Sequence, residues 1–199
     1  MTKGKLGFGT MRLPLTDSTD AKAIDYEQTN KMVDLFLEKG FNYVDTAYPY
    51  HGGLSEVAVG KCLVQRHPRD SFLLADKMLL RIVTETSQFQ KLFDEQLEKC
   101  CVDYFDYYLL HNMGKDSYRT SEKLGGFDFI KKVKAEGKAK LIGFSYHDGP
   151  ELLDEILTKY PIFDFVQLQI NYLDWTSHLI NSGKNYEVAV KHGLKVVVM

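Results

Sequence analysis

The chain has 199 residues, of which 44% are hydrophobic and 26% are charged, and its formal net charge is -2. This composition is typical of an ordinary globular domain that buries a substantial single core. The near-neutral charge gives no reason to expect nucleic acid or an anionic membrane as a partner. No apolar run approaches the roughly 20 residues of a membrane span, and no signal peptide is evident, so we expect a cytoplasmic protein.

The cysteines and histidines indicate neither a disulfide framework nor a metal site. Cys62 stands alone, and Cys100 and Cys101 are adjacent on a helical stretch, so no CxxC pair occurs. The helical spacing around Cys100 predicts a small buried hydrophobe rather than a reactive thiol. The six histidines show no paired ligand spacing, so we expect no bound metal.

Short apolar runs alternate with segments of helical periodicity along the whole chain. Strands are predicted at Leu6–Leu13, Phe41–Asp45, Phe72–Lys77, Tyr104–His111, Ala139–Ser145, Phe165–Asn171 and Lys195–Met199. Helices are predicted at Asp25–Lys39, Ser55–Gln65, Glu85–Cys100, Glu122–Glu136, Pro150–Lys159 and His178–His192. This alternation implies an α/β protein with a parallel sheet, and the number and even spacing of the repeats favour a (β/α)8 TIM barrel.

The predicted barrel is incomplete. The sequence stops at Met199 within an apolar strand, and about seven strands cannot close an eight-stranded barrel, which typically takes about 250 residues. The open edge would present unpaired backbone groups. We therefore interpret residues 1–199 as a single barrel domain truncated at the seventh strand.

Polar side chains follow three consecutive predicted strands. Asp45, Lys77 and His111 each stand at the end of a strand, and Tyr50 follows shortly after the second strand. Each has an ordinary structural explanation: a turn aspartate, a surface lysine, a core histidine and a packing tyrosine. Polar groups that converge at the same end of neighbouring strands share a pocket in a barrel, and this favours a catalytic site.

The sequence also resembles a known family. The run DTAYPYHGGLSEVAVGK is similar to the signature of the aldo-keto reductases, and LADKM and YLLHN are similar to its lysine and histidine segments. The resemblance runs from GFGTMRLP to VVVM in the family's order. It implies a catalytic tetrad of Asp45, Tyr50, Lys77 and His111, and NADP(H) or NAD(H) lying across the mouth of the barrel.

The implied reaction is the reduction of a small aldehyde or ketone, and the four residues suit it chemically. Tyrosine, with an ordinary pKa of about 10, is a poor acid near neutrality, and an adjacent ammonium makes it a better proton donor. Lys77 supplies that ammonium for Tyr50, the general acid, and Asp45 keeps Lys77 charged. His111 is expected to orient the substrate oxygen and stabilise its developing charge.

The resemblance implies further contacts to the cofactor. It places Ser145 and Gln167 near the nicotinamide carboxamide, and Gly9, Thr10 and Met11 along the approach of the ring, with Asp45 also beside the cofactor. Gln167 has an equally plausible interpretation as a hydrogen-bonding residue of the barrel interior.

After Ser145 the sequence departs from the commoner family pattern. Tyr146 and His147 stand where an asparagine usually follows, so His147 becomes a candidate for the missing contact or for touching the substrate. GFSYHD and QLQINYLD resemble one branch whose full-length members add a C-terminal iron–sulfur segment with four cysteines. The three cysteines here have the wrong spacing for it, so we expect such a cluster only in a longer parent chain.

Two other functions remain open from the residues alone. Lys77 in an aldolase-like site would form a Schiff base with a carbonyl substrate, although a nearby Asp45 would hold its amine protonated. The chain would otherwise be a catalytically inactive barrel fragment, or a binding or regulatory subunit. The oligomeric state and the choice between NAD and NADP are left undecided.

Overall fold

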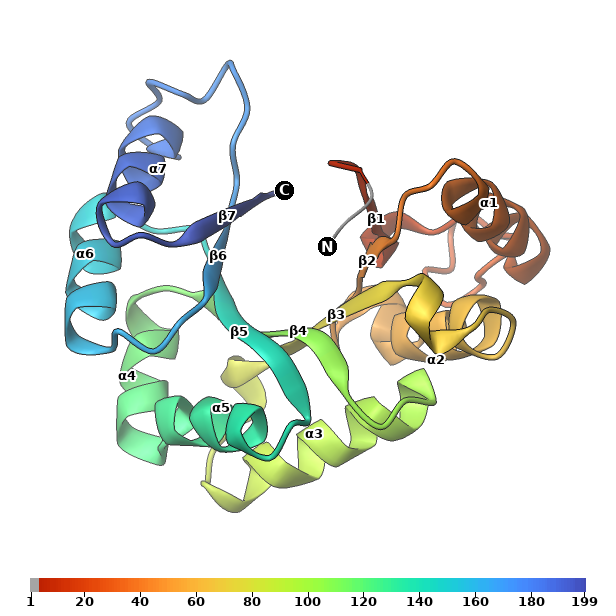
Figure 1. Ribbon diagram of the computed structural model, residues 1–199, viewed down its shortest axis with the longest axis horizontal. Coiled ribbons are helices and arrows are strands. Elements are labelled where there is room, and N and C mark those ends of the chain that lie inside the picture. The colour runs from red at the N-terminus through yellow and green to blue at the C-terminus, as the bar shows by residue number, and fades with distance from the viewer. Residues whose placement is uncertain (1–3) are drawn as a thin grey trace. The chain divides into compact units, whose positions relative to one another are not determined.

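The computed structural model describes residues 4–199, which form two compact units (Figure 1). The first unit consists of residues 4–78 and Gln90–Tyr107, and the second of Leu79–Phe89 and Tyr108–Met199. The strands are β1 (Gly7–Gly9), β2 (Tyr43–Asp45), β3 (Leu73–Met78), β4 (Phe105–Met113), β5 (Ala139–Tyr146), β6 (Phe165–Leu168) and β7 (Lys195–Val198). The α-helices are α1 (Tyr26–Glu38), α2 (Ser55–Val59), α3 (Ser87–Cys100), α4 (Lys115–Leu124), α5 (Gly126–Ala135), α6 (Pro150–Lys159) and α7 (Ser182–Lys191).

The strand order follows the chain from β1 to β7. This order, with helices between parallel strands, is that of a (β/α)8 fold, and residues 4–199 contain seven of its strands, as the sequence predicts. Short 3-10 turns occupy Thr10–Arg12, Tyr50–Gly53, Arg69–Ser71 and Leu80–Ile82, and a π-helical turn at Gly60–Val64 continues α2.

In the first unit, β2 pairs in parallel with both β1 and β3. Helix α1 begins where the Asp25 carboxylate accepts a hydrogen bond from the Gln28 backbone N–H at 2.9 Å. It ends before Gly40, whose φ of 83° glycine adopts without strain. Helices α1 and α2 lie on the same side of β1 and β2 (Figure 1).

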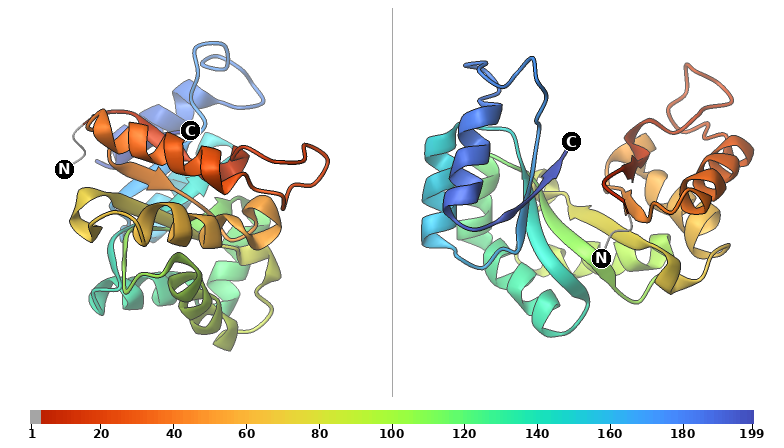
Figure 2. Two further views of the ribbon diagram at one scale, coloured as in Figure 1. Left: turned by 90° about the vertical axis from the view of Figure 1, so that its right-hand side faces the viewer. Right: turned by 45° about the horizontal axis from the view of Figure 1, so that its top comes forward.

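In the second unit, β6 pairs in parallel with β5 and β7. Helices α6 and α7 lie side by side, and α5 packs along β5 (Figure 1). Figure 2 shows the segment between β6 and α7 as a long connection that leaves the carboxyl end of the strand.

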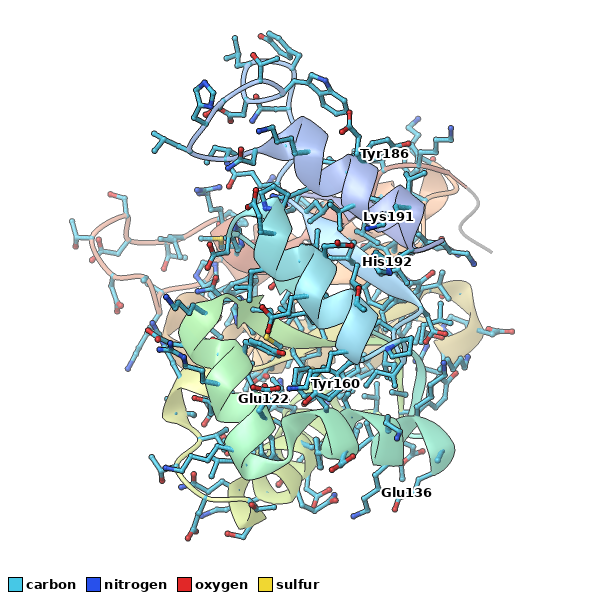
Figure 3. All side chains as sticks on the ribbon, turned by 90° about the vertical axis from the view of Figure 1, so that its left-hand side faces the viewer. Glu122, Glu136, Tyr160, Tyr186, Lys191 and His192 are labelled. Atoms are coloured by element: carbon cyan, nitrogen blue, oxygen red, sulfur yellow. The ribbon has the colours of Figure 1, made fainter. Side chains whose placement is uncertain are left out.

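Ion pairs tie the outer helices of the second unit together. The Glu122 carboxylate on α4 pairs with Lys159 and accepts a hydrogen bond from the Tyr160 hydroxyl at 3.0 Å. At the end of α7 stands His192, which Figure 3 labels, and its Nε2 lies 2.6 Å from an Asp154 carboxylate oxygen on α6. Such partly exposed pairs are worth little individually, so each adds little to the stability of the unit.

One predicted helix was wrong. Residues predicted as a single helix over Glu122–Glu136 form two helices, α4 and α5, because Gly125 adopts a φ of 84° and ends the first. The first predicted strand is also shorter than expected, since Thr10–Arg12 turns out of it. The buried position of Cys100 is confirmed, with 0% of its surface exposed.

No helix among residues 4–199 is both long and apolar enough to cross a membrane. Within the same described part of the chain, His, Cys, Asp and Glu side chains form no group of three or more that could hold a metal ion.

Candidate functional site

The register of the first unit brings the ends of its strands to one level. Asp45, the last residue of β2, lies opposite Gly9 of β1 and Ala75 of β3. Because side chains alternate along a strand, Lys77, two residues after Ala75 on β3, faces the same side of the sheet as Ala75. Tyr50 opens the 3-10 turn that follows β2. The local structure therefore carries three of the predicted catalytic residues to one edge of the sheet.

The Lys77 ammonium contacts both of the other two residues. Its Nζ donates to an Asp45 carboxylate oxygen, to the Thr46 carbonyl oxygen at 2.8 Å and to the Tyr50 hydroxyl oxygen at 3.4 Å. The same nitrogen lies 5.0 Å from the centre of the Tyr50 ring. An ammonium has three hydrogens, and these three oxygens account for all of them. Lys77 is 1% exposed and Asp45 is 9% exposed, so this cluster is largely shielded from water.

The electrostatics keep Lys77 charged in spite of its burial. Desolvation lowers the pKa of Lys77, but the Asp45 carboxylate and the Tyr50 oxygen together outweigh it, so the pKa of Lys77 is raised. A raised pKa means that the ammonium form persists throughout the neutral range. Lys77 is therefore a permanently charged ammonium placed against the Tyr50 phenol.

Tyr43 supports Asp45 from within the same strand. Its hydroxyl donates to the second Asp45 carboxylate oxygen at 3.5 Å. Burial, and then the charge of Asp45, raise the pKa of Tyr43 well above its ordinary value, so Tyr43 remains a neutral donor. Sequence reasoning missed this residue, although its position two residues before Asp45 on one strand face was a usable signal.

Hydroxyl groups fasten the ends of β1 and β2 to α2. The Thr10 hydroxyl donates to the Asp45 carbonyl oxygen at 3.0 Å and lies 2.7 Å from the Ser55 hydroxyl oxygen. The Thr46 hydroxyl lies 2.9 Å from the same Ser55 oxygen. Thr10 is 2% exposed, so its side chain is used within the protein. Its predicted contact with a cofactor stays a prediction.

His51 holds the turn that carries Tyr50. Its Nε2 accepts a hydrogen bond from the Leu13 backbone N–H at 3.0 Å, and its Nδ1 lies 2.7 Å from the Ala21 carbonyl oxygen. This pattern requires a neutral ring with its hydrogen on Nδ1. His51 also adopts a φ of 53°, which is uncommon for a residue with a side chain. The two backbone contacts stabilise this conformation next to Tyr50.

The predicted cofactor residues of the first unit leave open space beside Asp45. A Cβ atom added to Gly9 would meet nothing within 4 Å, and Met11 is 55% exposed. Gly9 is the direct register partner of Asp45. A flat ring would therefore find an unobstructed backbone at Gly9 and an exposed apolar side chain at Met11, and these two residues fit the expected nicotinamide.

The second unit carries the other predicted residues. Ser145 of β5 and Gln167 of β6 are register partners, and they are 1% and 4% exposed. The Ser145 hydroxyl oxygen accepts a hydrogen bond from the Asn112 backbone N–H at 2.8 Å. His111 precedes Asn112 on β4 and is half-buried. The structure thus pairs Ser145 with Gln167, while the role of His111 in the tetrad stays a prediction.

Tyr146 and His147, the two residues after Ser145, have different surroundings. Tyr146 is 1% exposed, and its hydroxyl donates to the Gly149 carbonyl oxygen at 2.5 Å. His147 is exposed, but partial desolvation of its ring lowers the pKa of His147, and Gln169 offsets part of that effect. A small cavity of about 140 Å³ lies at this end of the unit and is lined by Tyr146, His147, Leu168, Gln169, Ile180 and Asn185. Both residues that depart from the family pattern therefore line this cavity.

Comparison with known proteins agrees on one family. The sequence profile described as the aldo/keto reductase family matches residues 5–199. An aldo-keto reductase of Mycolicibacterium smegmatis is 32% identical over 132 residues, which are 66% of this chain and 44% of that protein. An NADH-specific methylglyoxal reductase of Escherichia coli is 27% identical over 164 residues, which are 71% of this chain and 48% of that protein. The chain spans about half the length of these relatives.

Solved structures agree with this result. The holo form of an aldo-keto reductase from Bacillus halodurans superposes with a TM-score of 0.71 at 26% identity, covering 98% of this chain and 61% of the other. An aldo-keto reductase described as putative from Pseudomonas aeruginosa has a TM-score of 0.76 at 20% identity, covering 98% of this chain and 72% of the other. The second likeness concerns the fold alone.

Proposed function

Because the chain belongs to the aldo/keto reductase family, we propose that it acts as an oxidoreductase that reduces a small aldehyde or ketone to an alcohol. The observation that carries this proposal is the buried contact of Lys77 Nζ with the Asp45 carboxylate and the Tyr50 hydroxyl. A nicotinamide dinucleotide, NADH or NADPH, supplies the hydride for this chemistry when it is bound. The name of the Escherichia coli relative, a reductase of methylglyoxal, supports a small carbonyl substrate.

Tyr50 is the proposed proton donor. Reduction places negative charge on the carbonyl oxygen, and a phenol within hydrogen-bonding reach of that oxygen neutralises it by transferring its proton. The resulting phenolate is stabilised by the Lys77 ammonium, which already lies 3.4 Å from the Tyr50 oxygen. Because the ammonium is in place before the reaction, no reorganisation of charge is needed when the proton leaves.

Asp45 and Tyr43 position the ammonium. The Asp45 carboxylate fixes Lys77 from one side, and the Tyr43 hydroxyl holds the second carboxylate oxygen. In this proposal His111 hydrogen-bonds the substrate oxygen and orients it. Gly9 and Met11 would hold one face of the nicotinamide, and Ser145 and Gln167 would bind its carboxamide.

The charge state of Lys77 counts against the Schiff-base alternative. An amine must be neutral to attack a carbonyl group, whereas the Asp45 carboxylate and Tyr50 overcome desolvation and raise the pKa of Lys77. Borohydride treatment in the presence of a ketone would trap an adduct on Lys77 if this alternative held, and we expect none.

The proposal is tested by following the consumption of NADH and of NADPH by the purified protein with methylglyoxal and a panel of small aldehydes and ketones. Tyr50→Phe should lower kcat about 100-fold or more, since positioned acids contribute about 10²- to 10⁴-fold. The matched control is Tyr172→Phe, because Tyr172 is 88% exposed. Unchanged turnover in Tyr50→Phe, or no turnover of any carbonyl compound by the unmodified protein, would contradict the proposal.

A further inference from the structure

A fully buried group of polar side chains lies on the other side of β3 from the Lys77 ammonium. Asp76 of β3, Glu56 of α2 and Gln96 of α3 are each 0% exposed. Burying a carboxyl group is costly unless it is hydrogen-bonded and its charge is compensated or removed. Two such carboxyls next to a proposed active-site lysine therefore need a physical explanation.

Side chains of this group hydrogen-bond to both the backbone N–H and the backbone C=O of Lys77. The Lys77 N–H donates to an Asp76 carboxyl oxygen at 2.7 Å. Gln96 Nε2 donates to the Lys77 carbonyl oxygen at 3.0 Å and to a Glu56 carboxyl oxygen at 2.9 Å. Both hydrogens of the Gln96 amide are thereby used. The main chain that carries the ammonium is held by side chains as well as by the sheet.

The charges around the group do not balance if both carboxyls are ionised. Lys99 is the cation that faces them, and its Nζ lies 3.3 Å from a Glu56 oxygen while also pairing with Glu95 at 2.6 Å. The Lys77 ammonium is already paired with Asp45 on the other side of the strand. One ammonium shared with a third carboxylate cannot compensate two buried charges.

A shared proton resolves this imbalance. Both carboxyls are fully buried and interact with each other, so a proton held by one of them would remove the uncompensated charge. Burial, and then the charge of Glu56, raise the pKa of Asp76 well above its ordinary value. Burial also raises the pKa of Glu56, but Gln96 and Lys99 face this carboxyl and offset part of the rise. The neutral member is therefore Asp76.

We propose that Asp76, held as a neutral carboxylic acid, and Gln96 are positioning residues that fix the Lys77 peptide groups. Neutral Asp76 adds no second negative charge beside Lys77, so Asp45 is the carboxylate that compensates the ammonium. The inference rests on the proposed function for the role of Lys77. Neither residue touches substrate, and both act through the main chain of Lys77.

The first experiment compares two substitutions of Asp76. Asparagine matches a neutral aspartic acid, because its oxygen accepts from the Lys77 N–H and its amide donates to Glu56. Asp76→Asn should therefore keep kcat within about twofold, whereas Asp76→Leu, which loses both bonds, should lower kcat about 10- to 100-fold with a smaller change in KM. Equal losses in both variants would overturn the proposal.

A second comparison covers the other positioning residue and does not depend on Asp76→Leu folding. Gln96→Met removes both donated hydrogen bonds, and Gln90→Met changes a glutamine of the same helix that donates to Asp94 at the surface. We expect kcat to fall about tenfold for Gln96→Met only. Equal kcat values in the two variants would overturn the role of Gln96.

A direct measurement decides the protonation state without any turnover. Carbon-13 NMR of the full chain, labelled at the Asp and Glu carboxyls, should show one protonated carboxyl at neutral pH, and Asp76→Asn should remove it. An ionised signal for Asp76 at neutral pH would overturn the proposal. If the protein reduces no carbonyl compound, the proposed function fails, while this signal still decides the state of Asp76.

Discussion

Removing one charge of the Lys77–Asp45 pair should destabilise the fold strongly. Asp45→Asn preserves size and one oxygen but removes the carboxylate that faces the Lys77 ammonium. Lys77 is 1% exposed, so its charge would remain buried with neutral acceptors alone, among them the Thr46 carbonyl and the Tyr50 hydroxyl. Breaking a buried pair from one side costs about 3–5 kcal/mol. Since asparagine retains an oxygen, we expect about 3 kcal/mol, the lower end of that range.

The double variant separates the buried charge from the lost contact. Asp45→Asn combined with Lys77→Met removes both charges, and its free energy of unfolding should return to within about 1 kcal/mol of the unmodified protein. Urea unfolding followed by circular dichroism gives the four free energies of this cycle. A loss below about 1 kcal/mol for Asp45→Asn alone, or a double variant no more stable than the weaker single one, would refute this reasoning.

The pH of this measurement follows from the sign of the shift. Although desolvation lowers the pKa of Lys77, Asp45 and Tyr50 raise it overall. The folded chain therefore holds this proton more tightly than the unfolded chain, so the stabilisation is fully present below the ordinary lysine pKa of about 10.4. It is lost as the pH rises through the folded value. Unfolding at neutral pH thus measures the whole effect.

Three further predictions concern backbone fit, a buried acceptor and pH. Gly60→Ala should cost about 1–3 kcal/mol in urea unfolding, because its Cβ would lie 2.6 Å from a backbone oxygen, whereas Gly9→Ala should be nearly neutral. Ser145→Ala should cost about 1–3 kcal/mol, because it leaves the Asn112 N–H without its acceptor. An unchanged melting temperature of this variant would contradict the prediction. Relative to Asp76→Asn, the unmodified protein should lose about 1.4 kcal/mol per pH unit above the ordinary aspartate pKa until the raised folded pKa is reached, and a constant difference would contradict this.

Much of the fold was predictable because strand and helix periodicities differ. The helix predicted at Pro150–Lys159 has those bounds in the structure, since a proline at its first turn and a preceding Gly149 define its start. The break at Gly125 was not predicted, because apolar spacing continues across it and only the backbone φ of 84° ends the helix. Periodicity reports which face is buried, and it is less informative about where the main chain turns.

The candidate site was predictable where polar residues stand at strand ends. Asp45 and Lys77 satisfy that rule, and the structure joins them. Tyr43, Glu56 and Gln96 escaped notice because each lies within a segment whose periodicity marks it as core. A polar residue on an expected core face is itself a signal, since burial demands a partner, but the sequence alone does not say which partner it meets.

Strand β3 explains why the proposed catalytic group and the buried acid group are coupled. Asp76 and Lys77 are consecutive, so their side chains point to opposite faces of the strand. Lys77 reaches Tyr50 on one face, while Asp76 faces Glu56 of α2 on the other. The two faces share the main chain of Lys77, whose N–H donates to Asp76 and whose C=O accepts from Gln96. A substitution in the helix layer can therefore displace the ammonium without touching it, and the matched variants of Gln96 and Asp76 measure that displacement.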